Sequence, residues 1–161
     1  MKQLSIFPQL GTDAIVWHLF IDGAARNNPG PAGAGMYILK NGVEFSRHGF
    51  FLGNKTNNQA EYLALLLGIL LLKAHMCPED KVIIKSDSQL LVRQLTGMYA
   101  IKNPELKRIA ATIKEMLSML KYTLVHIRRE ENSVADCLAN MGIDKKIPIS
   151  KDFLKVMACL L

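Results

Sequence analysis

The order of its expected secondary structure elements constrains the fold of this chain more than any other feature. Strand-like segments come first, at 17–22, 35–40 and 43–51, and Asn41-Gly42 between the last two favours a tight hairpin. We therefore expect an antiparallel meander of three strands. Because 17–22 is apolar at most positions, we expect this strand to be buried on both faces.

Helical and strand-like segments alternate along the rest of the chain. Helices are expected at 57–74, 88–95, 103–120 and 132–142, and strands at 81–87 and 122–128. The first of these helices is apolar nearly all round from Leu63 onward, which predicts a central, buried position. Gly142 is a natural end for the last helix. The order βββ-α-β-α-α-β-α predicts an α/β fold with helices on both faces of a mixed sheet.

Length and composition indicate one globular domain without a membrane anchor. Half of the 161 residues are apolar, enough to bury a sheet between helices. The longest apolar run, 63–72, is too short to cross a bilayer, and 1–8 does not resemble a signal peptide. Three cysteines without a Cys-x-x-Cys pair argue against both a disulfide framework and a zinc site. We expect a cytoplasmic protein with reduced cysteines.

The chain divides into one domain and two flanking segments. We place the domain at 17–144, an N-terminal extension at 1–16 and a C-terminal tail at 145–161. The stretch 153–161 has enough apolar residues for a short helix that packs back on the domain. A dimer contact through the same apolar stripe is the alternative, although we expect a monomer.

Four acidic residues occupy the ends of four separate expected elements. They are Asp22, Glu61, Asp87 and Asp136. Each lies in a polar, turn-forming context, where a carboxylate can point into solvent instead of a core. Four such carboxylates in one small domain predict a site for Mg²⁺, which favours hard oxygen ligands and keeps part of its water shell for a phosphate substrate. The alternative for Glu61 and Asp136 is a role at a helix N-terminus.

The net charge of the chain favours a polyanionic partner. The chain carries +6, and since the four acids contribute −4, all other residues together carry +10. A basic surface around a small acidic centre suits a nucleic acid whose scissile phosphate is delivered to metal. The competing interpretation is a basic balance that only keeps a small protein soluble.

Four motifs of the chain resemble those of the type 1 ribonuclease H family. They are Asp22-Gly-Ala-Ala-Arg-Asn-Asn-Pro-Gly-Pro-Ala-Gly, Thr56-Asn-Asn-Gln-Ala-Glu61, Ser86-Asp87-Ser88-Gln89 and Arg129-Glu-Glu-Asn132-Ser-Val-Ala-Asp136, and the match covers roughly 17–141. The resemblance implies the three-layer α/β/α fold of that family, with a five-stranded mixed sheet. It also implies cleavage of the RNA strand of RNA–DNA hybrids with two Mg²⁺ or Mn²⁺ ions, which leaves 5′-phosphate and 3′-hydroxyl ends.

The resemblance assigns roles to individual residues. The four acids match the family's catalytic, metal-binding residues, with Asp22 the ligand shared by both ions. The side chains expected in the minor groove, where 2′-hydroxyls distinguish RNA from DNA, are Asn28, Asn57, Asn58 and Gln89. Thr56 resembles a threonine that binds a phosphate of the DNA strand. For Asn28, turn formation alone is the alternative.

Two features depart from the family pattern. His126 lies ten residues before Asp136, where many members carry a catalytic histidine on a flexible loop. Here 124–127 predicts a strand, so His126 is either catalytic or a fixed strand residue.

The basic protrusion of some members is missing, because 97–104 connects two helices directly. Candidates for gripping the hybrid are instead Lys102, Lys107, Arg108, Lys114, Arg128 and Arg129.

Three functions are compatible with these observations. The leading hypothesis is an endoribonuclease specific for RNA–DNA hybrids. The second is a metal-dependent nuclease with broader substrate choice, such as double-stranded RNA, because a fold alone does not fix function. The third is a non-catalytic hybrid-binding module, against which the four intact acids argue. Carboxylates serve Mg²⁺ and Mn²⁺ alike, so either ion fits.

Overall fold

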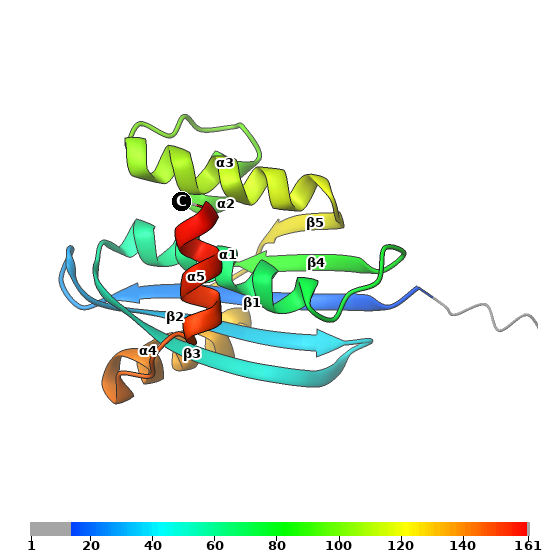
Figure 1. Ribbon diagram of the computed structural model, residues 1–161, viewed down its shortest axis with the longest axis horizontal. Helices are drawn as coiled ribbons and strands as arrows, with labels where there is room; N and C mark the ends of the chain where they lie inside the picture. Colours follow the sequence, from blue (N-terminus) through cyan, green and yellow to red (C-terminus); the bar gives the residue numbers. More distant parts are fainter. Residues whose placement is uncertain (1–13, 161) are drawn as a thin grey trace, which may run out of the picture.

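A five-stranded mixed sheet with helices on both faces forms the protein, as the computed structural model of residues 14–160 shows (Figure 1). The strands are β1 (Val16–Ala25), β2 (Gly30–Lys40), β3 (Val43–Lys55), β4 (Lys81–Ser86) and β5 (Lys121–His126). The helices are α1 (Asn57–Lys73), α2 (Gln89–Leu95), α3 (Pro104–Ser118), α4 (Ser133–Lys145) and α5 (Lys151–Leu160), with a 3-10 turn η1 (Arg129–Asn132) before α4. This confirms the predicted α/β fold class.

The strand order in space is β3-β2-β1-β4-β5. Strands β1, β2 and β3 pair antiparallel, which confirms the predicted meander, whereas β4 pairs parallel with both β1 and β5. The parallel pairs require crossover connections, and α1 provides one of them while α2 and α3 provide the other. All three parallel strands therefore end at the same edge of the sheet.

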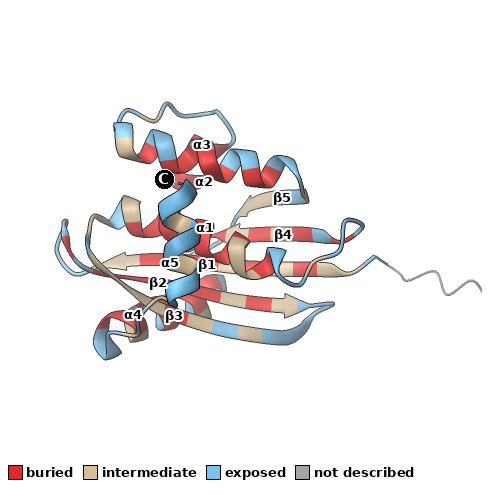
Figure 2. Ribbon diagram, in the orientation of Figure 1, coloured by how far each residue is buried: buried red, intermediate tan, exposed pale blue. Residues whose placement is uncertain are grey.

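The main hydrophobic core lies between the sheet and α1, α2 and α3. Helix α1 is buried over most of its length, as predicted, and the buried residues concentrate around it and the central strands (Figure 2). It lies close to β1 at Gly68, where an added Cβ would lie 2.9 Å from the Leu19 side chain. The apolar surface that α1 buries is the largest favourable contribution to this packing.

Within residues 14–160, α4 is the only helix on the opposite face of the sheet, and it packs backbone against backbone. Added Cβ atoms at Gly35 and Gly49 would lie 2.0 Å and 2.3 Å from carbonyl oxygens of α4. The prediction that Gly142 ends this helix is wrong, since α4 continues to Lys145 and Lys146 adopts the left-handed cap conformation. Gly142 lies inside the helix because the backbone of Phe50 leaves no room for a side chain there.

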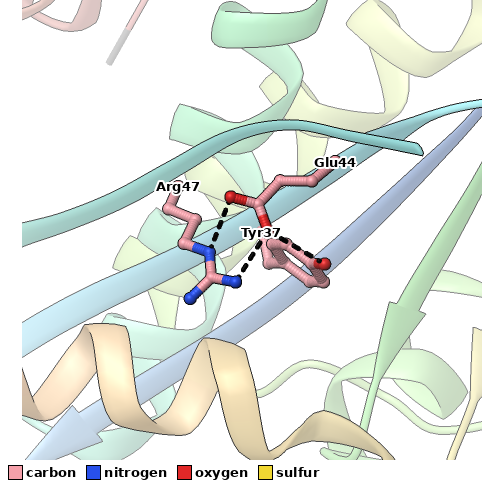
Figure 3. A network of polar contacts seen from close by, with 3 residues as sticks. All are labelled: Tyr37, Glu44 and Arg47. Atoms are coloured by element: carbon pink, nitrogen blue, oxygen red, sulfur yellow. Dashed lines mark hydrogen bonds and ion pairs between the residues drawn. The ribbon is translucent and has the colours of Figure 1, made fainter.

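The sheet face beyond the N-terminal end of α4 is only partly covered. The expectation that β1 is buried on both faces is therefore wrong for His18 and Phe20, which are half-buried. Lys85 lies over the Phe20 ring, 4.7 Å from its centroid. On the neighbouring strands, Glu44 accepts hydrogen bonds from Arg47 and from the Tyr37 hydroxyl (Figure 3). These polar contacts take the place of a covering helix.

The C-terminal tail forms α5, which lies on the α1 side of the sheet (Figure 1). Phe153 and Met157 pack against the main core, and the Thr112 hydroxyl of α3 donates to the Leu160 carbonyl at 3.1 Å. Of the expected N-terminal extension, 1–13 lies outside the described residues. Within residues 14–160, no helix combines the length and the apolarity that crossing a bilayer requires.

Candidate active site

The four predicted acids line one open basin of about 290 Å³. They come from four elements, since Asp22 lies in β1, Glu61 in α1, Asp87 directly after β4 and Asp136 in α4. Other side chains at this basin belong to Asn57, Arg129 and Asn140. The structure therefore brings together carboxylates that lie up to 114 positions apart in the chain.

Parallel pairing of β1 with β4 places two of the acids side by side. Ile21 pairs with Ser86, so Asp22 and Asp87 follow at adjacent strand positions at the same edge of the sheet. Glu61 reaches them because α1 begins against β1. An added Cβ at Gly23 would lie 2.1 Å from the Glu61 backbone nitrogen, so only glycine allows this approach.

Burial and the charges of neighbouring carboxylates raise the pKa of two of the four acids. Asp22 and Glu61 are only 7% and 8% exposed. Burial, followed by the charges of Asp87 and Asp136, raises the pKa of Asp22 to about 7, whereas Arg129 acts in the opposite direction. The pKa of Glu61 is also raised, first by burial and then by the charges of Asp22 and Asp87. A bound cation would relieve this repulsion.

The donor set fits a divalent cation that keeps part of its hydration shell. Glu61 Oε2 is buried and has no hydrogen-bond partner, so one carboxylate oxygen is free to accept a ligand bond. Within residues 14–160, no group of three or more Asp, Glu, His or Cys side chains is already arranged to hold a metal ion by itself. An open site of carboxylates suits Mg²⁺, which completes its octahedron with water and substrate phosphate oxygens.

Two asparagines support the acids by hydrogen bonds that the sequence did not reveal. Asn132, only 1% exposed, donates from Nδ2 to Asp87 Oδ1 at 2.7 Å and to the Ile21 carbonyl at 2.9 Å. Asn140 donates from Nδ2 to Asp136 Oδ1 at 3.2 Å. The position of Asn140, four residues after Asp136 in a helix, was the only available signal.

Arg129 is a basin residue that the sequence suggested only as a charge for gripping the hybrid. It lies in η1, at the wall of the basin, where its charge lowers the pKa of Asp22. The compact turn η1 leads directly into α4 and places Arg129 at the basin. No spacing rule predicts such a turn from the sequence. The positive charge of Arg129 offsets part of the charge of the acids.

The predicted minor-groove residues surround the basin at different distances. Asn57 lines it and accepts a hydrogen bond from the Ala25 backbone N–H at 3.0 Å. Asn28 lies beside it, since its Oδ1 accepts from the Asn57 backbone N–H at 2.9 Å. Asn58 and Gln89 are exposed on the first turns of α1 and α2, outside the basin lining. All four residues are exposed to solvent.

Thr56 forms the N-cap of α1. Its hydroxyl oxygen accepts from the Gln59 backbone N–H at 3.2 Å, and the Gln59 side chain accepts from the Thr56 N–H at 2.8 Å. This capping box satisfies two backbone donors at the start of the helix. The hydroxyl hydrogen of Thr56 stays available to a phosphate oxygen, so the capping role does not exclude the predicted one.

His126 is the last residue of β5 and is exposed. Its Nε2 lies 3.2 Å from the Asp87 carbonyl oxygen, and its side chain does not line the basin. The predicted strand at this position is therefore confirmed. A catalytic role for His126 stays a prediction.

Comparison with known proteins identifies relatives of the chain. The family model described as "Reverse transcriptase-like" matches residues 20–142. Ribonuclease HI of Halobacterium salinarum is 37% identical over 129 residues, which cover 79% of this chain and 64% of that protein. Ribonuclease H of Coxiella burnetii is 32% identical over 143 residues, covering 80% of this chain and 90% of that protein.

A solved structure shares the fold as well as the sequence. LC11-RNase H1, crystallised in complex with an RNA/DNA hybrid, is 38% identical and superposes with a TM-score of 0.75 over 81% of this chain and 97% of that chain. The sequence motifs, the sheet order and these relatives agree with one another. The chain therefore belongs to the type 1 ribonuclease H family.

Proposed function

We propose that the protein is an endoribonuclease that hydrolyses the RNA strand of RNA–DNA hybrids with two Mg²⁺ or Mn²⁺ ions, leaving 5′-phosphate and 3′-hydroxyl ends. One observation carries the proposal: carboxylates from four separate elements line a single open basin. Gathering these like charges does not stabilise the fold, because the neighbouring carboxylates add to the burial that raises the pKa of Asp22 and of Glu61. Such an arrangement is typical of a functional site.

The choice of substrate is supported by relatives and by charge. The related LC11-RNase H1 was crystallised with an RNA/DNA hybrid. The net charge of +6, despite the acids at the basin, suits a polyanion. Asn57 and Asn28 form a hydrogen-bonded pair beside the acids, where amide groups can meet 2′-hydroxyls in a minor groove.

The carboxylates of the basin would hold the ions that the hydrolysis requires. Bound divalent ions would supply an activated water and stabilise the charge on the leaving 3′ oxygen. Asp22 and Asp87 provide oxygens from adjacent strands, and Glu61 and Asp136 add oxygens from the helices on the two faces of the sheet. Contrary to the expectation from the sequence, Asp22 does not close its strand, because β1 continues to Ala25. Arg129 offsets part of the negative charge when the ions are absent.

Cleavage of matched substrates tests this proposal. Labelled RNA–DNA hybrid, double-stranded RNA, single-stranded RNA and DNA are incubated with Mg²⁺ or Mn²⁺ and the wild type, Asp87→Asn or Asp152→Asn. We expect metal-dependent cutting of the hybrid's RNA strand only, lost by at least about a thousandfold in Asp87→Asn, because an oxygen ligand becomes an amide. Asp152→Asn, an exposed acid on α5, serves as the matched control and should behave as the wild type.

The other outcomes point to the alternative functions. Cutting of double-stranded RNA as well would favour the broader nuclease. Tight hybrid binding without cleavage under either metal would support the binding module and end the proposal of an enzyme. End-labelled products compared with a hydrolysis ladder decide the end groups.

A further inference from the structure

Asn140 forms a hydrogen bond with the side chain of Asp136 at the basin. Its Nδ2 donates to Asp136 Oδ1 at 3.2 Å and to the Asp136 carbonyl oxygen at 3.0 Å. The two residues lie four positions apart on α4 and therefore on one face of the helix. Asp136 also lies near Asp22 in the basin, where its charge helps to raise the pKa of Asp22.

Arg26, in the turn between β1 and β2, determines which way the Asn140 amide faces. Its Nη2 donates to Asn140 Oδ1 at 3.4 Å, and its Nη1 forms an ion pair with Asp144 Oδ1 at 2.6 Å. A guanidinium can only donate hydrogen bonds, so it requires the oxygen of the amide. The NH₂ group of Asn140 is therefore left to face Asp136.

We infer that Asn140 and Arg26 are positioning residues that hold the Asp136 carboxylate in the orientation in which it binds a divalent ion. This inference rests on the proposed function, since it presupposes a metal at the basin. Without the amide, the carboxylate could turn about its side-chain bonds and would lose that freedom only when the ion binds. Outer groups that orient a ligand typically change metal affinity by about 10–100-fold.

The roles of the two residues differ from those of the acids. Neither Asn140 nor Arg26 provides a carboxylate, and Arg26 acts on Asp136 only through Asn140. Arg26 is about half exposed, so its charge is partly screened. What matters is that its planar fork contacts Asn140 and Asp144 at the same time, which a lysine at the same position would not reproduce.

Direct binding of Mn²⁺ without substrate tests the inference on the full chain. Electron paramagnetic resonance of free Mn²⁺ gives the dissociation constant for the wild type, Asn140→Ala and the matched control Asn54→Ala, an exposed asparagine on β3. We expect Asn140→Ala to raise the Mn²⁺ Kd about tenfold and Asn54→Ala to leave it unchanged. Alanine favours a helix more than asparagine, so α4 should not melt in this variant, and thermal unfolding checks this.

The direction in which the Mn²⁺ affinity changes in Arg26 variants distinguishes a positioning role from a purely electrostatic one. Removing a cation beside an acidic basin would by itself strengthen Mn²⁺ binding. We expect Arg26→Ala to weaken it instead, by about threefold, and Arg26→Lys to weaken it to the same degree. The double variant Arg26→Ala/Asn140→Ala should bind no more weakly than Asn140→Ala alone, because the two residues act in series.

Each result has a definite consequence. Unchanged Mn²⁺ affinity in folded Asn140→Ala, or stronger binding in Arg26→Ala, would overturn the inference while the proposed nuclease stands. If the wild type itself bound no Mn²⁺, and Asp87→Asn did not differ from it, the metal site of the proposed function would fall, and the inference with it.

Discussion

At the scale of single residues, Asp22 shows how strongly a buried carboxyl responds to its neighbours. Burial and the charges of Asp87 and Asp136 act in the same direction and raise its pKa to about 7. Glu61 responds in the same way. In the metal-free protein the ionised form of Asp22 is therefore only partly populated near neutral pH, and burial and like charges disfavour the ionised form of Glu61 as well.

We expect the metal-free protein to lose stability as the pH rises from about 4 to about 7. The unfolded chain ionises Asp22 near its ordinary pKa of 3.8, whereas the folded protein retains the proton until about 7. The unfolded state then binds fewer protons across this window, so the free energy of unfolding falls with pH, by an amount on the order of 4 kcal/mol at most. Urea unfolding in the presence of EDTA at several pH values measures this.

The variant Asp22→Asn provides the control for this pH dependence. It removes the titrating group, so the free energy of unfolding should change less between pH values of about 4 and about 7. A slope equal to that of the wild type would assign the effect to other groups, Glu61 first. Saturating Mg²⁺ should reverse the trend, because an ion at the proposed site would bind the ionised carboxylates.

Asp80, at the opposite edge of the sheet, has a structural role. Only 4% exposed, it accepts hydrogen bonds from the Trp17 indole at 2.9 Å, the Cys77 N–H at 2.9 Å and the Ile15 N–H at 3.3 Å. Burial raises its pKa, but these donors outweigh burial, and the pKa is lowered overall. The carboxylate therefore joins the start of β1 to the turn before β4.

We expect Asp80→Asn to reduce the free energy of unfolding by about 2 kcal/mol, because an NH₂ group would face an N–H donor. Urea unfolding at neutral pH measures the loss. The neighbouring exposed variant Glu79→Gln, which removes only an ion pair with Lys121, should leave the free energy of unfolding nearly unchanged, because solvent screens that pair. Equal losses in the two variants would contradict the assigned role of Asp80.

At the scale of elements, the position of α4 decides the geometry of the basin. The helix carries Asp136 and lies directly on the backbones of β2 and β3, where glycines leave room for it. An added Cβ at Gly35 would meet the Ala135 carbonyl oxygen and the Ala139 nitrogen, and neither can move without the whole helix. Any side chain there must displace α4 together with its acid.

We therefore expect Gly35→Ala to cost about 3 kcal/mol or more and to reduce cleavage beyond the loss of folded protein. Gly68→Ala is the matched control, since its Cβ would meet side-chain atoms of Leu19 that can shift. Alanine in a helix also contributes about 1 kcal/mol relative to glycine, which offsets that contact. Chemical unfolding and cleavage rates distinguish the two, and similar effects at both positions would contradict this account of α4.

The same helix shows what sequence reasoning could and could not determine at this scale. Asn132-Ser133 was recognised as its start, because N-terminal signals are local. Its end was placed at Gly142, because glycine is a common C-terminal residue of helices. The contact of Gly142 with the Phe50 backbone, which explains this glycine, joins residues 92 positions apart. No local pattern reports such a contact.

At the scale of the whole molecule, the net charge of +6 predicts how a hybrid binds. We expect the affinity of the Asp87→Asn variant for a hybrid to fall about tenfold or more from about 50 to about 200 mM KCl, because phosphate contacts release counterions. Fluorescence anisotropy measures this. The preference for hybrid over DNA duplex should change less, since it depends on minor-groove contacts. Affinity independent of salt would contradict binding through phosphates.

The sequence by itself determined the element order, the meander of the first strands and the identity of the four acids. Periodicity, turn residues and motifs are local properties of a chain, so they can be read without its fold. Only the tertiary structure decided that Arg129 and Asn140 join the basin, that Arg26 orients Asn140, and that His126 lies outside the basin lining. These facts depend on which segments pack together and at what distance. Packing between segments that are remote in the chain does not produce a periodic pattern in the sequence.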